Sequence, residues 1–252
     1  MNTYKATLLA ALAILLTFSA CGGPEAQADE SSAAPETSSI VFDEAMKDRA
    51  CELLTAEMVA DVAGVPVEEL SQFAPWSSLC EYSWGSGNQI RLSGITVHDE
   101  SATARNRFEA AYSEYTAEEM DGGRQAMNAE LDRQSAAGEI DGAAAEQASG
   151  LGGMFADIAA STKYDRIDGV GDLAVYDGTV RNMNMPIIGE IVVSESQAYV
   201  LLGNLNFSVE GRVQPPGGER ERSTPPPPEE LAANRDFTVE IARRVADRLR
   251  EM

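Results

Sequence analysis

The first twenty-one residues limit which part of the chain can fold into a domain, because they have the pattern of a leader that ends at a cysteine. Lys5 makes the start of the chain positive, residues 6–17 form an apolar run, and the run closes with Phe-Ser-Ala at 18–20, directly before Cys21. A transmembrane helix needs ~20 apolar residues, so this run is too short to cross a bilayer. A positive start, a short apolar stretch and small residues before a cut are typical of a secretory signal peptide. We therefore assign residues 1–20 to a leader.

The cysteine that follows these small residues resembles the lipobox of bacterial lipoproteins, where it is acylated and becomes the first residue. Ser19 and Ala20 fit that pattern, whereas Phe18 stands where leucine is usual. The alternatives are an ordinary signal peptide cut near Ala20 and an uncleaved anchor. The resemblance implies a palmitate-type lipid on Cys21 and an extracytoplasmic protein held at the cell membrane. In a cell with two membranes it implies the outer one, since Gly22 is not the aspartate that retains lipoproteins at the inner membrane.

A polar stretch separates Cys21 from the rest of the chain. Residues 22–39 read GGPEAQADESSAAPETSS, with almost no large apolar side chain. Such a composition buries too little surface to offset the entropy lost on ordering, so we expect residues 21–40 to be a disordered tether. At ~5–6 Å × √n, this tether would hold a folded domain roughly 20–25 Å from the lipid.

Composition narrows the classes of partner. The chain has 252 residues, 44% of them hydrophobic, which suits one domain over residues 41–252. With 41 acidic and 19 basic residues, its formal charge is −22. A surface this acidic argues against nucleic acid and against docking on anionic lipid headgroups. We therefore expect membrane attachment only through the lipid on Cys21, and we predict no cofactor.

Three cysteines are present, at positions 21, 51 and 80. If Cys21 carries lipid in a compartment that permits disulfides, Cys51 and Cys80 have only each other. Their bridge would close a loop of about 30 residues, worth roughly 3–4 kcal/mol by the loop-entropy relation. A catalytic cysteine is the weaker alternative, because His98 is the only histidine. We predict a structural disulfide.

The first half of the domain predicts a helix and then a hairpin. Thr55 is placed as the N-cap of a short helix, and Gly64 stands where a left-handed C-terminal residue is expected. Residues 80–84 alternate as a half-buried strand. Residues 90–97 form the next strand, and its apolar positions change phase at 93–94, which indicates a β-bulge.

Helical spacing follows over residues 101–120, and a polar, alanine-rich helix is expected over 124–137. The next segment, 138–161, is rich in Gly and Ala and is interpreted as a lid, a partner contact or a loosely packed helix. We treat 121–163 as a helical insertion. An apolar patch in it is a candidate ligand or lid surface, formed by Leu151, Met154, Phe155 and Ile158.

Strand signals return after residue 172. Asp177-Gly178 between two strand-like runs predicts a hairpin with a type I′ turn. Residues 187–193 and 198–207 are expected to pair through a connection at 194–197. A proline-rich loop at 212–228 comes next.

The chain ends in an amphipathic helix over 229–251, whose apolar residues recur every four positions at Phe237, Ile241, Val245 and Leu249. Together these elements predict an α+β fold. We expect an antiparallel sheet of about five to six strands, covered on one face by helices that include this long C-terminal one.

Four features in a fixed order resemble a group of bacterial lipoproteins that share an extracytoplasmic domain of unknown function. They are Cys51-Glu52-Leu53-Leu54-Thr55, the second cysteine on the strand at 80–84, the Gly-Val-Gly-Asp turn at 169–172, and the C-terminal helix. The similarity spans roughly residues 51–249. It implies a compact α+β domain outside the cell with the Cys51–Cys80 bridge, and it brings no activity or substrate.

Residues that could carry chemistry are few. His98 precedes two carboxylates, but a solvated histidine at a strand end is the commoner situation. Aspartates at 165, 168, 172 and 177 lack the spacing of an EF-hand loop, and Asp beside Gly is mostly turn chemistry. Gly-Leu-Gly-Gly at 150–153 lacks the strand and helix of a dinucleotide loop. We predict no metal site and no catalytic residue.

These observations favour a lipid-anchored envelope lipoprotein whose domain is a non-enzymatic, partner-binding or sensor-like accessory. One alternative is a carrier or binding domain for a small apolar ligand, with residues 149–161 as its lid. A second alternative is a carboxylate-dependent hydrolase that acts on the envelope, since paired carboxylates can act without histidine.

Overall fold

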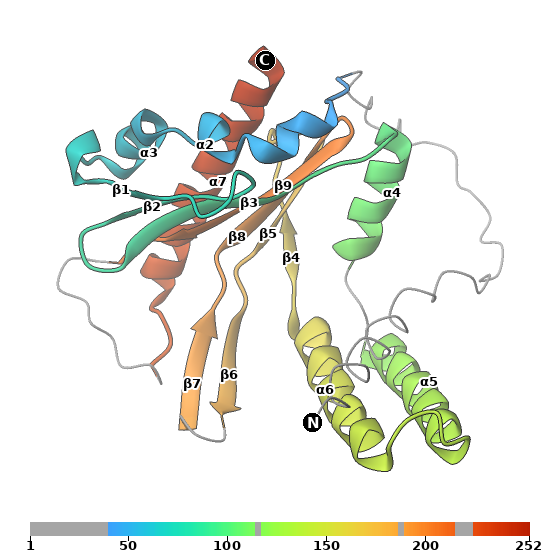
Figure 1. Cartoon of the computed structure of the whole chain (residues 1–252). Coiled ribbons are helices and arrows are strands. Elements are labelled where there is room, and N and C mark those ends of the chain that lie inside the picture. Colours follow the sequence, from blue (N-terminus) through green and yellow to red (C-terminus); the bar gives the residue numbers. More distant parts are fainter. Residues whose placement is uncertain (1–39, 114–116, 186–188, 215–223) are drawn as a thin grey trace, which may run out of the picture. The chain divides into compact units, whose positions relative to one another are not determined.

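The computed structural model describes residues 40–113, 117–185, 189–214 and 224–252 (Figure 1). Its elements follow in chain order: η2 (Glu44–Asp48), α2 (Ala50–Leu53), α3 (Ala56–Ala63), η3 (Val67–Glu69), β1 (Ser71–Phe73), β2 (Cys80–Trp84), β3 (Asn88–Val97), α4 (Ser101–Ala111), α5 (Ala117–Ala136), α6 (Gly142–Ser161), β4 (Tyr164–Arg166), β5 (Leu173–Asp177), β6 (Val180–Met185), β7 (Gly189–Ser194), β8 (Gln197–Leu202), β9 (Leu205–Arg212) and α7 (Pro228–Glu251).

The described chain divides into two compact units. The smaller holds α5 and α6, and the larger holds all the other elements. In the smaller unit the two helices pack closely and antiparallel: Ser149 Oγ donates to Asn128 Oδ1 at 2.8 Å, and a Cβ added to Gly152 would meet the Met127 side chain. Small residues in α6 permit this approach, which also explains why its sequence shows little helical amphipathicity.

A seven-stranded antiparallel sheet forms the larger unit, in the order β1-β2-β3-β9-β8-β5-β4. The expected α+β class, antiparallel sheet and long C-terminal helix are confirmed. The sheet exceeds the expected five to six strands because of its two edges. Both β1 and β4 have only three residues, too few to show an alternating pattern in sequence.

One face of this sheet carries the main core. The stripe predicted for the C-terminal helix is buried along α7: Phe237 is 8% exposed, and Ile241, Val245 and Leu249 are at most 1% exposed. It packs with inward-facing strand residues such as Val200, and α2 and α3 lie beside it (Figure 1). Fully burying one large aliphatic side chain is worth roughly 1.5–3 kcal/mol, so this stripe holds α7 on the sheet.

The opposite face of the sheet is covered in part by α4, which the sequence did not indicate. Ala104 and Phe108 pack with Leu201 and with the half-buried Tyr199. These strand residues alternate with Val200, which faces α7, so they point to the other side of the sheet. Helices therefore lie on both faces.

The hairpin expected at Asp177-Gly178 is wrong. β5 pairs with β8 and β4, while β6 pairs with β7 in a separate two-stranded sheet. Instead of reversing the chain, Asp177 Oδ1 accepts a hydrogen bond from Thr179 N at 2.9 Å, and the strand passes on from one sheet to the other. A glycine is needed at 178 because a Cβ there would lie 2.6 Å from the Tyr176 ring.

The pairing expected across residues 194–197 is also wrong. β7 runs on into β8 without pairing with it, and the β8 partner is β9. The reversal lies at Gly203-Asn204, where Gly203 has a φ of 59°. The apolar run at 198–207 hid this turn, because a single Gly-Asn pair interrupts residues that are otherwise buried.

The same turn is hydrogen-bonded to Phe42, near the first described residue. Asn204, 2% exposed, accepts from Phe42 N at 2.7 Å and donates to Phe42 O at 3.0 Å and to His98 O at 2.7 Å. Asp172, from the Gly-Val-Gly-Asp turn, accepts from Gly203 N at 2.8 Å. Four separate parts of the sequence therefore meet at one end of the sheet.

Two glycines with similar backbones test this junction. Gly64 and Gly203 have φ of 66° and 59°, so alanine at either position should cost roughly 1–2 kcal/mol from the backbone alone. A Cβ at Gly64 has no neighbour within 4 Å, whereas one at Gly203 would lie 2.0 Å from Ile40 O. Urea unfolding should show Gly203→Ala to be the more destabilising by about 1–3 kcal/mol. Equal losses would mean that Ile40 does not pack on the turn in solution.

Candidate interaction surface beside the disulfide

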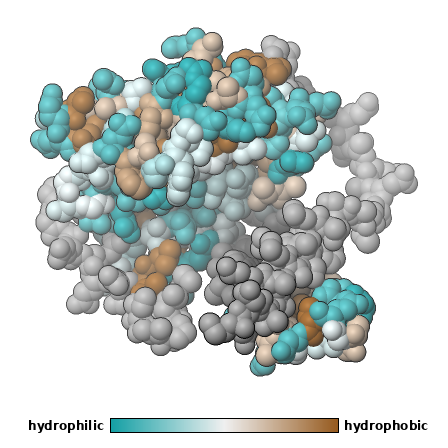
Figure 2. Space-filling view, viewed as in Figure 1, coloured by the Kyte–Doolittle hydropathy of each residue, from teal (hydrophilic) through white to brown (hydrophobic). Residues whose placement is uncertain are grey.

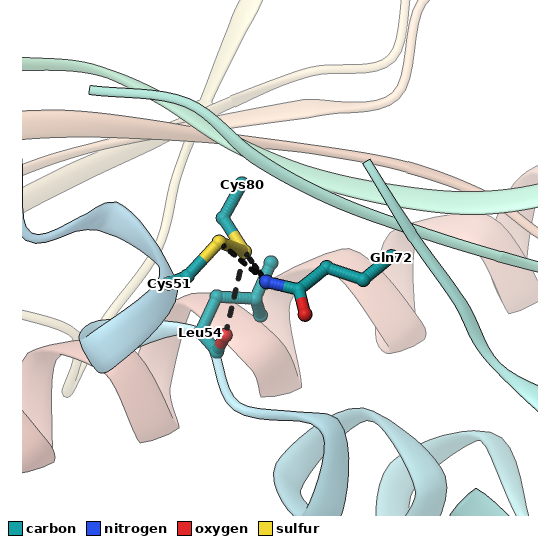
Figure 3. The surroundings of a disulfide bond; sticks show 4 residues. All are labelled: Cys51, Leu54, Gln72 and Cys80. Carbon is teal, nitrogen blue, oxygen red and sulfur yellow. Dashed lines mark hydrogen bonds between the residues drawn. A yellow bond between two sulfur atoms is a disulfide. The ribbon is translucent and has the colours of Figure 1, made fainter. Parts of the chain in front are cut away.

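The predicted disulfide is confirmed. Cys51 in α2 and Cys80 at the start of β2 are bonded, with Cα atoms 5.0 Å apart (Figure 3). Cys80 is fully buried and Cys51 is half-buried. The Gln72 amide, from edge strand β1, donates to Cys51 Sγ at 3.0 Å, and Leu54 O lies 3.7 Å from Cys80 Sγ. The bridge thus ties α2, β1 and β2 together.

The loop between β1 and β2 is held at several points. Leu79 N donates to Trp76 O at 3.1 Å, closing a turn. Ser77 O accepts from Ala50 N at 3.1 Å, which satisfies a backbone donor at the start of α2, and Ser77 Oγ donates to Asp48 Oδ1 at 2.7 Å. Together with the bond at Cys80, these contacts fix the backbone of the loop.

Two large aromatic side chains project from this fixed segment. Phe73 is 58% exposed and Trp76 is 67% exposed. Residues 71–78 are all exposed, yet none of them is charged, in a chain with 60 charged residues. Protein interfaces are depleted of charge at their centres and enriched in Trp and Phe. We name residues 71–78 the aromatic segment.

On the face of the molecule that Figure 2 draws, the surface outside the aromatic segment is mostly polar. Figure 2 shows the described residues on that face as mostly hydrophilic, with small separate hydrophobic areas in place of one broad apolar patch. Isolated apolar residues on a surface are ordinary. The aromatic segment is set apart by two aromatics within four residues, the absence of charge and the braced backbone.

Sequence reasoning missed Phe73 and Trp76. A signal was present, since residues 70–80 carry no charge between the acidic pair Glu68-Glu69 and Glu81. Their exposure could not be read from sequence, because an uncharged aromatic stretch before a strand is as easily a core segment. Only the three-dimensional position of β1 at the sheet edge separates the two readings.

The residues considered for chemistry do not converge. His98, directly after β3, has its Nε2 2.7 Å from Oδ1 of Asn206 in the neighbouring strand β9. Asp172 and Asp177 bond backbone amides, whereas Asp165 and Asp168 are exposed. Within the described residues, no group of three His, Cys, Asp or Glu side chains could hold a metal ion.

Arg181 lies between the carboxylates of Asp177 and Glu195. Arg181 Nη2 lies 3.9 Å from Asp177 Oδ2, and its Nη1 lies 3.6 Å from Glu195 Oε1. Burial raises the pKa of Glu195, with a further contribution from the charge of Asp177. Arg181 of β6 also donates to Thr162 Oγ1, so it joins the connection before β4, the end of β5 and the β7–β8 connection. This arrangement is a brace where the two sheets meet.

Two expected sites cannot be placed. Cys21 lies outside the described residues, and so do the side chains of the apolar patch at Leu151, Met154, Phe155 and Ile158 in α6. Among the helices in the described ranges, none combines the length and the apolar character needed to span a membrane.

Compared with known proteins, the chain matches no family model, no curated protein and no solved structure. The likeness to lipoproteins with a domain of unknown function therefore stays a prediction.

Removing the disulfide tests its role in the aromatic segment. Replacing Cys51 and Cys80 together by serine should cost roughly 3–4 kcal/mol of unfolding free energy, because the bond closes a loop across a sequence separation of 29. Hydrogen exchange should quicken most at residues 71–79. Cys21→Ser, which leaves the bridge intact, is the matched control. Unchanged exchange in the double variant would show that the loop is held without the bond.

Proposed function

We propose that this chain is an envelope lipoprotein anchored through lipid on Cys21, whose domain binds a protein partner through the aromatic segment. The observation that carries the proposal is the pair Phe73 and Trp76, both more than half exposed on a backbone fixed by a disulfide and hydrogen bonds. Holding a binding loop in shape before association lowers the entropy lost on binding.

The place where the tether would join the domain supports an anchored arrangement. The described chain begins at Ile40, and Phe42 is hydrogen-bonded on both sides to the Gly203-Asn204 turn. A polar tether over 22–39 attached there would leave the domain free to reorient above the lipid. With a formal charge of −22, the chain would be repelled by anionic headgroups, which leaves the surface of the domain available to partners.

The chemistry of the segment favours a protein partner. Trp is among the residues that supply most of the binding energy in many protein interfaces, and Phe is enriched at interface cores. The flanking Ser71, Gln72 and Ser77 offer neutral hydrogen-bonding groups, which suit a polar rim. A highly charged ligand would find nothing in this segment to pair with.

Serine at both aromatic positions tests the binding role. Phe73→Ser with Trp76→Ser should weaken partner binding by about 30-fold or more, since interface hot spots lose at least ~2 kcal/mol when truncated. The measurement is the mass of the protein extracted from its own membranes in mild detergent, by light scattering and native mass spectrometry. The wild type should run as a complex and the variant as a single chain.

Val41→Ser is the matched control, because Val41 is 72% exposed and lies outside the aromatic segment. All three side chains are exposed, so their replacement should change the unfolding free energy by less than about 0.5 kcal/mol. A wild type that extracts as a single chain would contradict the proposal, and so would a double variant that keeps its complex.

The anchor has its own test. The intact mass of the native protein should correspond to a chain that begins at Cys21 and carries acyl groups, gaining two hydrogens when the Cys51–Cys80 bond is reduced. A lipid-free chain that begins elsewhere would contradict the anchoring and leave the aromatic segment to be judged separately.

A further inference from the structure

Arg105 in α4 breaks the usual rule that buried polar atoms have partners. Its Nε and Nη2 are buried and make no hydrogen bond, although its side chain as a whole is 18% exposed. Among the described residues, the carboxylate paired with Arg105 is that of Glu109, whose Oε1 lies 3.5 Å from Nη1, and Glu109 itself is 56% exposed. A buried donor without a partner costs free energy, and more so on a charged group.

The two unpartnered nitrogens are the ones that recognise oxyanions. The Nε–H and Nη2–H bonds of a guanidinium lie side by side and can donate in parallel to two oxygens of one carboxylate or phosphate group. In this chain 41 acidic residues compete for 19 basic ones, so most arginines find carboxylates easily. Arg91, for example, pairs with Glu81 at 2.7 Å and Glu210 at 3.2 Å. Leaving this edge of Arg105 unpaired is therefore not forced by a shortage of acids.

The helix that carries Arg105 is held mainly at its C-terminal end. There Phe108 is buried against Leu201, and Tyr112 stacks on Tyr199 with ring centroids 4.3 Å apart. Burial raises the pKa of Tyr112 and Tyr199, which reflects how closely this end is covered.

The N-terminal end of α4 is held more weakly. Its N-cap residue, Glu100, makes no side-chain capping bond, and Asp99 and Glu100 are both exposed. Of the first two turns of α4, only Ala104 is buried. Elements with few buried contacts open locally at small cost, so the half of α4 that carries Arg105 can lift while the tyrosine end stays in place.

We propose that Arg105 forms an anion-binding site under the N-terminal half of α4, in which Nε and Nη2 bind one carboxylate or phosphate group of a ligand. In this structure the site is closed and the two donors are buried. Binding requires the first turns of α4 to lift, and the anion then supplies the partners that the closed state lacks. This site is independent of the aromatic segment, since it needs neither Phe73 nor Trp76.

Thermal unfolding in different anions tests the site on the purified full chain. Inorganic phosphate and acetate are compared with chloride at equal ionic strength. At ten times its dissociation constant, the bound anion should raise the wild-type Tm by about 3–5 °C above chloride. The more effective of the two anions identifies the ligand group. Because the anion binds the state in which the first turns of α4 are lifted, hydrogen exchange over residues 101–107 should quicken in the same anion.

Three variants separate this site from general salt effects. Arg105→Leu removes both donors and should lose the anion response, while its Tm in chloride rises because two buried donors without partners are gone. Arg105→Lys keeps the charge without the paired donors and should lose most of the response. Arg107→Leu, at an exposed position of the same helix, should respond as the wild type does.

Two results would overturn the proposal. One is a wild type that neither phosphate nor acetate stabilises beyond chloride. The other is an equal gain in the wild type and in Arg105→Leu, which would be the general effect of excluded salts on folded proteins.

Discussion

The apolar stripe of α7 on the central strands is the contact on which the larger unit depends. Ile241, Val245 and Leu249 are almost completely buried, and they meet strand residues such as Val200 and Phe207 that are equally buried. Because β8 and β9 are central strands, this contact determines which of their faces points inward. The alternation of side chains, carried through the antiparallel register, then assigns the same face on every other strand.

The outer face follows from that assignment. On β2, β3 and β9, the side chains that point away from α7 are polar. Glu81, Arg91 and Glu210 lie side by side on this face and form ion pairs across the three strands. On β5 and β8 the same face is apolar and aromatic, and α4 covers it. A short helix is enough there, because half of the face is already suited to water.

What the sequence predicted well were local features with a strong physical signal. Thr55 accepts a hydrogen bond from Met58 N as an N-cap should, Gly64 is left-handed, and the phase change at Ser93-Gly94 is a register shift between β3 and β9. The bridge between Cys51 and Cys80 followed from counting. Each of these depends on a few neighbouring residues or on elimination, so no knowledge of the sheet was needed.

The predictions that were wrong concern strands that pair with partners distant in the sequence. Asp-Gly at 177–178 carries the composition of a type I′ turn, yet β5 finds its partner in β8, some twenty residues later, and the Asp side chain bonds Thr179 N along a continuing chain. Trp76 and Phe73 were passed over for the same reason. Their exposure is a property of the sheet edge, and the sequence does not say which strand lies there.

The aromatic segment is uncharged on a protein that is otherwise strongly acidic. A formal charge of −22 lets the protein bind neutral or basic surfaces and resists close contact with acidic ones. Because the aromatic segment is uncharged, bringing a partner into close contact with it costs less desolvation free energy than contact with the charged surface would. The disulfide ties the aromatic segment to α2, so the bond that stabilises the fold also keeps Phe73 and Trp76 exposed on the surface. The Cys51–Cys80 disulfide and the proposed contact surface therefore lie next to each other, and the disulfide supports that surface directly.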